Sequence, residues 1–359
     1  MRLRCVASFL VLITVCCTAL AESVNGWRGD GDGRYEEANP PLQWSRDDNV
    51  RWKTSLDGKS NASPILVGNR IFVCREPGTL LCLDQETGDI LWEKTTEYPD
   101  LVPLEKQAEV RREMEAALEL QKKINRVNRK RNKAKRELRK AEKKIKEAEK
   151  AKGAEGEGEA ADAGKDEGKK TALPDLEPIK QEIAELTKQL EPLKKELEPI
   201  REWCPPNKHS VNGYTSPTPT SDGKHVFVLY GTGIAAAFDF DGNRLWARLV
   251  EKPQHGWGHS ASPLLAGGHL ILHIRRLHAV DKSTGETVWT GAARKRWGSP
   301  VRTGIDGHDV VITAAGDMFR AEDGKQLAKE LSKLTYCAPL VHENIVYFIE
   351  HGGKAFRLP

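Results

Sequence analysis

The chain contains 359 residues, of which 38% are hydrophobic, 30% are charged and 6% are aromatic, and its formal net charge is +4. A chain of this length can bury a substantial hydrophobic core. The low aromatic and high charged fractions exclude a chain that is packed uniformly, so part of it must lie outside the core.

The first 21 residues have the organisation of a secretory signal peptide. Arg2 and Arg4 precede an apolar stretch at Val6–Val15, and Ala19–Ala21 supplies an A-x-A cleavage site. We therefore expect residues 1–21 to be removed and the protein to be exported to the periplasm or the extracellular space. The apolar stretch is too short to span a membrane in the mature protein, and export separates the protein from nucleic acid. No transmembrane segment and no nucleic-acid partner are expected.

The first part of the mature chain, residues 22–103, contains an irregular lead-in and then the first copy of a repeat. Asn49–Leu56 carries Trp52 and is predicted to form one strand. The repeat begins at Ser63, and its segment Cys82–Trp92 contains Asp-x-x-Thr-Gly with a Trp four residues after the Gly. An Asp side chain can accept hydrogen bonds from its own turn, and Gly tolerates a positive φ. The segment is therefore predicted to be a tight hairpin between two strands.

Four of the seven cysteines lie beyond the predicted signal peptide: Cys74, Cys82, Cys204 and Cys337. An even number in an exported chain permits disulfides. Cys74 and Cys82 flank a Glu-Pro-Gly turn, and they are predicted either to form a disulfide across one hairpin or to be two buried apolar thiols. No Cys-x-x-Cys or His/Cys metal-binding spacing occurs, so no metal site is predicted.

A charged insertion, residues 104–202, separates the first copy from the others. From Leu104 to about Lys150 the chain is almost free of Gly and Pro, and its apolar residues recur at alternating steps of three and four, which predicts a heptad seam. The same steps resume from Leu176 to Ile200. The insertion is therefore predicted to be an antiparallel coiled-coil hairpin.

Two details qualify this hairpin. Residues 151–174 contain a low-complexity Ala/Gly/Glu/Asp stretch and are predicted to be a disordered link. Pro192 is expected to kink or break the second arm because it removes a backbone donor.

The segment Lys122–Lys146 is densely basic and is predicted to be a solvated face whose acidic partners lie on the other arm. The alternative is an arm that docks on an anionic surface, such as a membrane leaflet or an acidic polysaccharide.

Residues 203–359 contain four more copies of the repeat. Each copy begins with a small residue and a Pro, and these pairs recur about every 40 residues. They are Ser216-Pro217, Ser262-Pro263, Ser299-Pro300 and Ala338-Pro339. The turn-and-Trp element is complete at Ala279–Trp289, shorter before Trp246 and degenerate in the fourth copy. This period is typical of a β-propeller blade. Unrelated hairpins in a β-sandwich are the alternative, but they give no reason for a constant spacing.

The motif Ala-x-Asp-x-x-Thr-Gly-x-x-x-Trp resembles the tryptophan-docking motif of PQQ-like (pyrrolo-quinoline quinone) repeat β-propellers, a family that includes quinoprotein alcohol dehydrogenases and BamB-like proteins. The resemblance implies an all-β propeller with the helical hairpin as an insertion. It also implies that four indoles pack against neighbouring blades: Trp52, Trp92, Trp246 and Trp289. About five blades are recognisable, with the strand at 49–56 completing the last. PQQ-like propellers usually have about seven or eight blades, so the ring is expected to be truncated or unusually small.

The family contains catalytic and non-catalytic members. Quinoprotein dehydrogenases carry an adjacent Cys pair beside PQQ together with calcium ligands, and this sequence has no adjacent Cys pair after residue 21. It also lacks a nucleophile elbow, a His-Glu-x-x-His motif and a phosphate loop. We therefore predict no catalytic, cofactor-binding or metal-binding residues.

The favoured function is a non-catalytic exported scaffold that contacts protein partners through the propeller face and the coiled-coil arm. By analogy with BamB, it would act in envelope or outer-membrane protein assembly. One alternative is a PQQ- and calcium-dependent oxidoreductase of the alcohol dehydrogenase type, or a degenerate relative of one. The other alternative is a polysaccharide- or surface-binding module.

One unusual cluster favours a ligand. His255, Trp257 and His259 precede the third copy, and Arg275 and Arg276 occupy a hairpin turn where other copies have Gly. Loops at a propeller face often carry binding residues, so these five side chains are predicted to grip an anionic or sugar ligand. The alternative is that they pack at strand ends against the adjacent blade.

Overall fold

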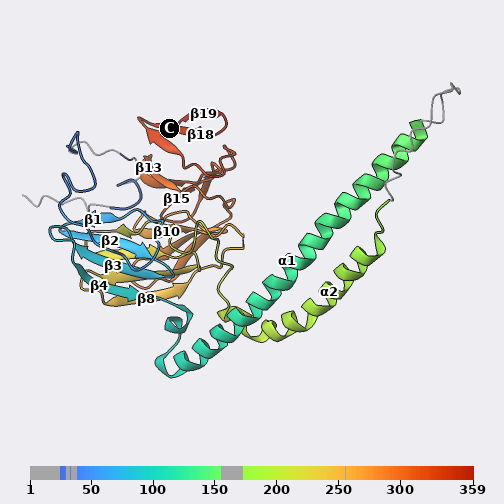
Figure 1. Cartoon of the computed structure of the whole chain (residues 1–359). Helices are drawn as coiled ribbons and strands as arrows, with labels where there is room; N and C mark the ends of the chain where they lie inside the picture. Colours follow the sequence, from blue (N-terminus) through green and yellow to red (C-terminus); the bar gives the residue numbers. More distant parts are fainter. Residues whose placement is uncertain (1–24, 30–32, 34–38, 155–172, 255) are drawn as a thin grey trace, which may run out of the picture. The chain divides into compact units, whose positions relative to one another are not determined.

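The computed structural model describes residues 25–29, 33, 39–154, 173–254 and 256–359 (Figure 1). The chain forms two compact units: a repeat unit, Met1–Thr95 with Lys208–Pro359, and a helical unit, Thr96–Asn207. The predicted signal peptide, residues 1–21, and most of the predicted link lie outside the described residues. Among the residues that are described, no helix is long and apolar enough to cross a membrane.

The described strands form five antiparallel sheets, and in each sheet the strands follow one another in chain order. The first sheet contains β1 (Ile65–Val67), β2 (Arg70–Arg75), β3 (Thr79–Asp84) and β4 (Ile90–Thr95). The second contains β5 (Thr220–Ser221), β6 (His225–Leu229), β7 (Ile234–Asp239) and β8 (Arg244–Leu249). The third contains β9 (Leu264–Ala266), β10 (His269–His273), β11 (Leu277–Asp281) and β12 (Thr287–Gly291).

The last two sheets are shorter. The fourth contains β13 (Val301–Ile305), β14 (His308–Ile312), β15 (Met318–Arg320) and β16 (Gln326–Ala328). The fifth has three strands: β17 (Leu340–His342), β18 (Ile345–Ile349) and β19 (Gly353–Arg357). The first strands of successive sheets lie beside one another, because β9 contacts both β5 and β13, and β13 contacts β17.

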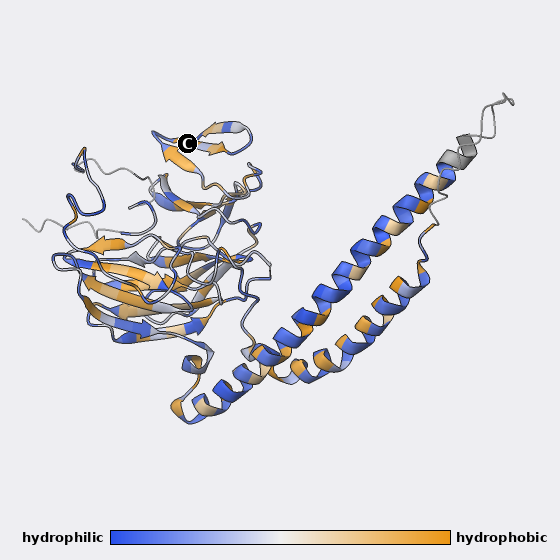
Figure 2. Cartoon of the chain, viewed as in Figure 1, coloured by the Kyte–Doolittle hydropathy of each residue, from blue (hydrophilic) through white to orange (hydrophobic). Residues whose placement is uncertain are grey.

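The hydrophobic core lies between successive sheets. One buried cluster joins Phe227 and Ala237 of the second sheet to Leu270 of the third. Similar clusters join the third sheet to the fourth and the fourth to the fifth. The middle strand β3 is therefore almost continuously buried and β2 is buried at Phe72–Cys74, whereas the fourth strand β4 is mostly exposed. Figure 2 shows this as hydrophobic colour in the middle strands of the sheets.

The repeated Asp-x-x-Thr-Gly motif forms a turn that its own Asp holds. Asp281 Oδ1 accepts hydrogen bonds from the backbone N–H of Ser283 at 2.8 Å and of Thr284 at 2.9 Å. Gly285 then has a φ of +71°, which only Gly adopts readily. Asp84 binds Glu86 and Thr87 in the same way. The sequence requirement is therefore local, because each residue of the motif serves its own turn.

Each repeated Trp docks on the turn of the next sheet. Its Nε1–H donates to a backbone oxygen there: Trp92 to Phe240 at 2.9 Å, Trp246 to Lys282 at 2.8 Å and Trp289 to Ala321 at 2.8 Å. The ring lies directly on the turn glycine, since a Cβ on Gly285 would come within 2.5 Å of the Trp246 ring. The glycine is thus needed both for the turn and for the close approach of the indole.

The structure differs from the sequence prediction at Asn49–Leu56, which forms no strand. Trp52 nevertheless donates to Gln85 O at 2.9 Å, the same contact that the other three indoles make. A strand needs a neighbour for its N–H and C=O groups, and this segment has no described strand beside it. It therefore does not complete the fifth sheet.

The second copy also begins later than predicted. Thr218-Pro219, rather than Ser216-Pro217, takes the place of the Ser-Pro pair. Ser63 N donates to Thr218 Oγ1 at 3.2 Å, Thr218 N donates to Ser262 Oγ at 3.0 Å, and Ser262 N donates to Ser299 Oγ at 3.0 Å. The small residue before Pro is therefore a hydroxyl that links one sheet to the next.

The disulfide that was predicted as one alternative is not formed. Cys74 lies opposite Leu80 and Cys82 lies opposite Phe72, so the two thiols are diagonal neighbours. Diagonal positions lie about 7–8 Å apart, which is too far for the geometry of a disulfide. All four described cysteines are free, and Cys74, Cys82 and Cys204 are buried. Burial raises the pKa of the Cys74 thiol to about 12.

The helical unit consists of a short 3-10 helix η1 (Tyr98–Leu101), then α1 (Leu104–Ala154), α2 (Glu177–Leu197) and a second 3-10 helix η3 (Glu198–Trp203). A buried seam contains Ala117, Leu120 and Ile124 of α1 with Leu190 and Leu197 of α2. The sequence predicted a kink or a break at Pro192, and α2 continues through this residue without a break. The seam residues on both sides of Pro192, at positions 190 and 193, remain packed and hold the helix together.

Candidate binding site

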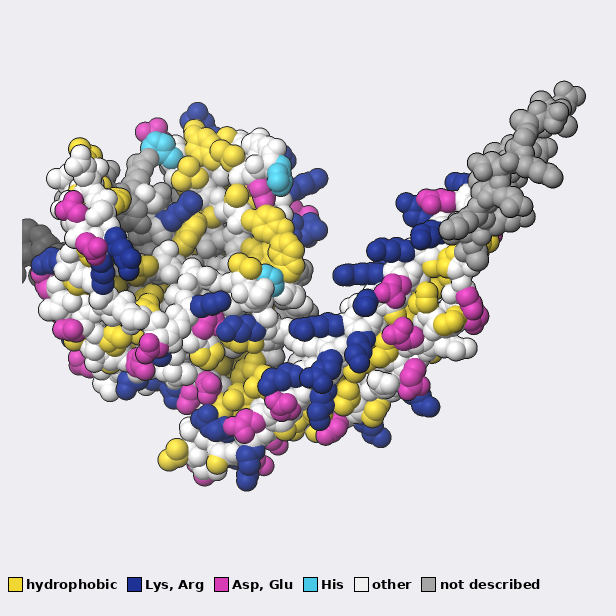
Figure 3. All heavy atoms as spheres, in the orientation of Figure 1, with side chains coloured by type: hydrophobic (Ala, Val, Ile, Leu, Met, Phe, Trp, Pro, Cys, Tyr) yellow, Lys and Arg dark blue, Asp and Glu magenta, His cyan; other side chains and the backbone are white. Residues whose placement is uncertain are grey.

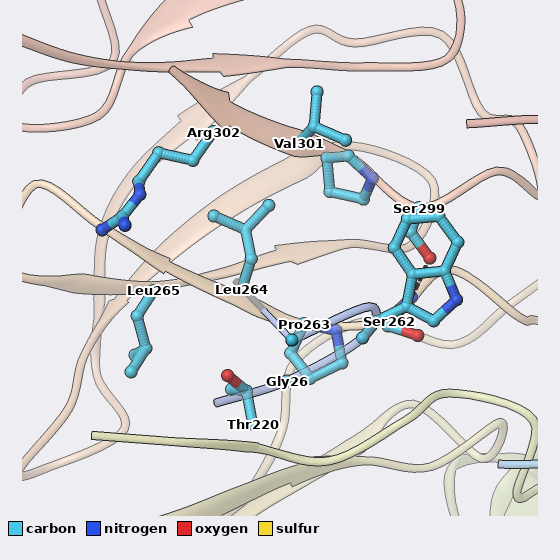
Figure 4. A pocket seen from close by; sticks show the side chains of 12 residues that line it. Gly26, Thr220, Ser262, Pro263, Leu264, Leu265, Ser299, Val301 and Arg302 are labelled. Carbon is cyan, nitrogen blue, oxygen red and sulfur yellow. Dashed lines mark hydrogen bonds between the residues drawn. The ribbon is translucent and has the colours of Figure 1, made fainter. Parts of the chain in front are cut away.

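The innermost strands of the repeat unit enclose only a small pocket. Its lining comes from β5, β9 and β13, from the Ser-Pro pairs and from Gly26–Gly29 (Figure 4). Next to the lining residues Gly26 and Thr220, Asn25 pairs with Ser221 in an antiparallel bridge. The cavity is about 20 Å³, which is room for one water molecule.

PQQ with calcium does not fit these residues. Pockets for organic cofactors usually measure about 300–1,000 Å³, far above the volume of the pocket between the innermost strands. The residues that the structure describes also contain no group of three or more His, Cys, Asp or Glu side chains that could hold a metal ion. No step of oxidation chemistry is therefore derived from this pocket.

Large aromatic side chains gather elsewhere on the repeat unit, in the loops that precede β9, β13 and β17. We call Trp257, Trp297, Tyr336 and His209 the aromatic platform. Trp257 and Tyr336 are nearly parallel, with ring centroids 6.2 Å apart, and Trp297 lies 5.9 Å from Trp257 and 5.6 Å from Tyr336. His209 stacks on Trp257 at 6.3 Å. Trp257 is 50% exposed and Tyr336 is 54% exposed, although both are residue types that proteins usually bury in large part.

The predicted ligand-facing residues do not form one site. Trp257 is exposed, but His259 is only 1% exposed and therefore cannot face a ligand. Its Nε2 lies 3.0 Å from Ala261 O, and burial lowers its pKa to about 3, so the ring is neutral. His255 lies outside the described residues. The sequence could not indicate that Trp257 is exposed and His259 is buried, because the two residues are only two positions apart.

Arg275 and Arg276 turn out to cap a buried carboxylate. Glu251 accepts hydrogen bonds from the backbone N–H of Arg275 at 2.9 Å and of Arg276 at 3.0 Å, and its Oε2 lies 3.2 Å from His278 Nε2. Burial opposes ionisation of Glu251, but these hydrogen bonds outweigh it and lower its pKa. The two arginine side chains remain about half exposed, at 43% and 57%.

Similar carboxylates hold the other loops around the platform. Glu350 accepts the backbone N–H of Thr335 at 2.7 Å and of Tyr336 at 3.2 Å. Glu76 accepts the N–H of Tyr214 at 2.6 Å, and Asp317 accepts that of Arg294 at 3.0 Å. The sequence analysis missed these acids. In the sequence these acids are marked only by their position, because a single Asp or Glu lies next to the end of a strand in several copies.

A buried histidine, His273, lies under the same region. Burial lowers its pKa to about 4, and neither ring nitrogen has a hydrogen-bond partner within the described structure. His278 is also buried, and its pKa is lowered because desolvation exceeds the effect of Glu251. These groups are neutral near pH 7, so they add no positive charge to the surface above them.

Two cations lie beside the platform, and one buried nitrogen of each makes no hydrogen bond within the described residues. The Nζ of Lys295 lies 5.6 Å from the centroid of the Trp297 ring and makes no hydrogen bond within the described residues. Burial, together with the charge of Arg275, lowers the pKa of Lys295. The Nε of Arg296 is likewise without a partner there, although its Nη1 donates to Lys295 O at 3.0 Å.

Two family models match parts of the chain. The model described as outer membrane protein assembly factor BamB matches residues 208–295, which contain the second and third sheets. The model described as Mis12 protein matches residues 80–222, which contain the helical unit. No curated protein matches the chain.

Similar solved structures have low identity. BamB from Moraxella catarrhalis is 14% identical with a TM-score of 0.41, over 87% of this chain and 67% of that one. The quinohemoprotein alcohol dehydrogenase from Comamonas testosteroni is 10% identical with a TM-score of 0.38, over 84% of this chain and 43% of that one. A quinohemoprotein alcohol dehydrogenase from Pseudomonas putida HK5 is 14% identical with a TM-score of 0.34, over 83% and 29%.

The repeat unit is a propeller of stacked antiparallel sheets joined by docked indoles. The resemblance to PQQ-like repeat β-propellers is confirmed, because the BamB model matches the sheets in which the turn-and-Trp element is best formed. Within that class, this chain carries a helical unit between its first and second sheets.

Proposed function

We propose that this protein is an exported, non-catalytic propeller that acts as a protein-interaction scaffold, with the helical unit as a second contact surface. The observation that carries the proposal is a contrast within the repeat unit. The innermost strands leave room for about one water molecule, whereas Trp257 and Tyr336 are presented to solvent. Exposed Trp and Tyr side chains supply most of the binding energy in many protein interfaces. The BamB match extends the proposal to outer-membrane protein assembly.

The architecture that goes with this function has two parts. The five sheets are five consecutive blades, in residues 22–103 and 203–359. The helices α1 and α2 form an antiparallel coiled-coil hairpin in residues 104–202. Support for the hairpin comes from the seam, in which Ala117 near the start of α1 meets the end of α2 (Figure 1).

Site-specific photo-crosslinking in the native envelope tests the scaffold. A photoreactive amino acid at position 257 or 336 should give a discrete protein adduct, and the same substitution at exposed Trp44 serves as the control. In parallel, the protein is incubated with PQQ, calcium and an alcohol in a dye-linked oxidation assay. Alcohol-dependent turnover would show that the oxidoreductase alternative is correct and the scaffold proposal is wrong.

Export is tested separately. Residues 1–25 are fused to alkaline phosphatase, which is active only after export. Activity that is lost when Val6–Val15 is deleted supports a signal peptide. An inactive fusion would contradict export and would remove the periplasmic or extracellular placement.

A second function, docking of the arm on an anionic surface, is favoured by one observation. Basic side chains of α1 pair with acids of α1 itself, as in Lys133–Glu137 at 3.9 Å and Lys143–Glu147 at 3.6 Å. Within the residues that the structure describes, none of them pairs with an acid of α2, where the sequence had placed their partners. Other basic residues of α1 are exposed, which Figure 3 shows as a row of Lys and Arg along the helix: Arg126, Arg129, Lys130, Lys135 and Arg136.

Vesicle binding tests this second function. The protein should bind vesicles that contain anionic lipid more tightly than neutral ones, and added salt should weaken binding. Replacing the five exposed basic residues by Gln should reduce binding by about 1 kcal/mol for each residue that touches the surface. The matched control replaces three lysines of α2: Lys188, Lys194 and Lys195. Equal loss in both variants would argue against a specific basic face.

A further inference from the structure

The aromatic platform has the composition of an interface hot spot. Trp, Tyr and Arg are the residue types that dominate binding energy at protein interfaces. Here two Trp rings and one Tyr ring lie within 6.2 Å of one another, with Arg275 and Arg276 nearby on the same unit. Figure 3 shows hydrophobic side chains gathered on the exposed face of the repeat unit, with Lys and Arg around them.

The loops that carry the platform are held in place before any partner binds. Glu350 caps the backbone at Thr335 and Tyr336. Trp297 N donates to Thr335 O at 2.9 Å, and Ser260 Oγ donates to Trp297 O at 3.0 Å. Gly298 lets the two loops touch, because any Cβ there would collide with Cys337 O. A rigid surface loses little entropy on binding, which favours affinity.

The charges beside the platform are unbalanced. The acids of this region, Glu251, Asp317 and Glu350, are occupied by backbone N–H groups. Glu251 carries one negative charge against the three positive charges of Arg275, Arg276 and Lys295, and the side chains of Arg275 and Arg276 are 43% and 57% exposed. The carboxylates of a partner would pair with these two exposed arginines, and its apolar groups would cover the exposed rings.

We propose that the aromatic platform, with the exposed Arg275 and Arg276 beside it, is the docking site for an acidic, extended peptide segment of a partner protein. The proposal rests on the scaffold function and names the chemistry that the scaffold would recognise. An extended segment fits best because its side chains can alternate between the rings and the cations, as Pro-rich and acidic segments do on other aromatic-lined or basic surfaces.

The test uses the full-length protein and a fluorescent twelve-residue peptide that alternates Glu with Pro and Leu, a length of about 40 Å when extended. Fluorescence anisotropy should show saturable binding that weakens with salt. A peptide with Gln in place of Glu should bind at least tenfold more weakly. Trp257→Ala and Tyr336→Ala should each weaken binding about 30-fold, the loss expected of a hot-spot residue. Arg275→Gln should weaken binding of the Glu peptide but leave binding of the Gln peptide unchanged, and it retains the backbone N–H that Glu251 accepts.

The controls separate docking from folding. Trp44 is 66% exposed and lies outside the platform, so Trp44→Ala should bind the peptide like the parent. Trp257→Phe should keep part of the affinity if the ring is the contact. Because Trp257 and Tyr336 are half exposed, their substitutions should leave the thermal melt unchanged. If the melt does shift, the Arg275→Gln variant tests docking without the removal of a ring.

Three outcomes would overturn the proposal. The first is equal affinity for the Glu and Gln peptides, and the second is unchanged affinity after Trp257→Ala. The third is preferential binding of an oligouronate, which would make the platform a site for acidic polysaccharide instead. Failure of this proposal can be distinguished from failure of the scaffold function. If the helical unit is crosslinked to a protein and no PQQ-dependent turnover is seen, the scaffold function is still supported even when the platform does not bind the peptide.

Discussion

The repeat unit and the helical unit of this chain are stabilised in different ways. In the repeat unit each sheet depends on the next, because Trp246 of the second sheet donates to Lys282 of the third and covers Gly285. In the helical unit many polar contacts are local, such as Lys180–Glu177 at 2.8 Å and Lys194–Glu191 at 3.2 Å. Loss of one indole should therefore propagate between sheets, whereas loss of one helical ion pair should cost little.

The largest expected effect comes from removing an inter-sheet indole. Trp246 is 7% exposed, so Trp246→Ala should lower the free energy of unfolding of the repeat unit by about 3–5 kcal/mol. Trp289 is less buried and Trp289→Ala should cost less. Urea denaturation followed by tryptophan fluorescence measures both, with exposed Trp44→Ala as the control. An equal, small loss in all three would show that the indoles do not join the sheets.

Acid should weaken the repeat unit more than the helical unit. His259 and His273 have folded pKa values of about 3 and about 4, below the unfolded value of about 6.5. The unfolded chain therefore binds protons first as the pH falls, and stability that is complete above pH 6.5 is lost below it. Between pH 7.5 and 5.5 each histidine should remove about 1.4 kcal/mol.

The control for this prediction is a substitution at an exposed residue without a titratable side chain. His273→Asn should reduce the slope of stability against pH in this range, and Trp44→Ala should leave it unchanged. The measurement is the unfolding free energy of the β signal at several pH values. A slope that is the same in both variants would contradict a role for His273.

A change at the docking turn should have an intermediate effect. Gly285 has a φ of +71° and the Trp246 ring lies against it, so Gly285→Ala should cost on the order of 2 kcal/mol from backbone strain and crowding. Gly268 also has a positive φ but nothing lies within 4 Å of its added Cβ, so Gly268→Ala should cost only the strain. A thermal melt of both variants separates the two contributions, and equal shifts would rule out a contribution from the ring.

The smallest effect is expected from removing the arm. Residues 104–202 are replaced by a short Gly/Ser linker, and the repeat unit should keep a cooperative melt close to that of the parent. The closure entropy of a loop changes by only ~0.6 kcal/mol per doubling of length, and the apolar seam of the arm is satisfied within the helical unit. Loss of the cooperative β transition in circular dichroism would show that the two units depend on one another.

Local patterns were predicted well from the sequence because their causes are local. The Asp281 turn, the helices α1 and α2 and the repeated strands each depend on residues a few positions apart. The prediction of a strand at Asn49–Leu56 was wrong because a strand also needs a neighbouring strand, which no pattern within the segment reveals. The helix α2 is not broken at Pro192, because packing against α1 offsets the loss of one backbone donor.

In the candidate site, too, local features were predictable from the sequence and contacts between distant residues were not. The sequence by itself determined the repeat, the Trp docking element and the presence of unusual aromatic and basic residues near position 257, since each is a matter of residue type and spacing. Only the tertiary structure decided which of them are exposed. It buries His259, turns the backbone of Arg275 and Arg276 onto Glu251, and brings Trp257, Trp297 and Tyr336 together from three separate copies. Contacts between residues that lie about 40 positions apart depend on how successive sheets stack, and a one-dimensional pattern does not encode that stacking.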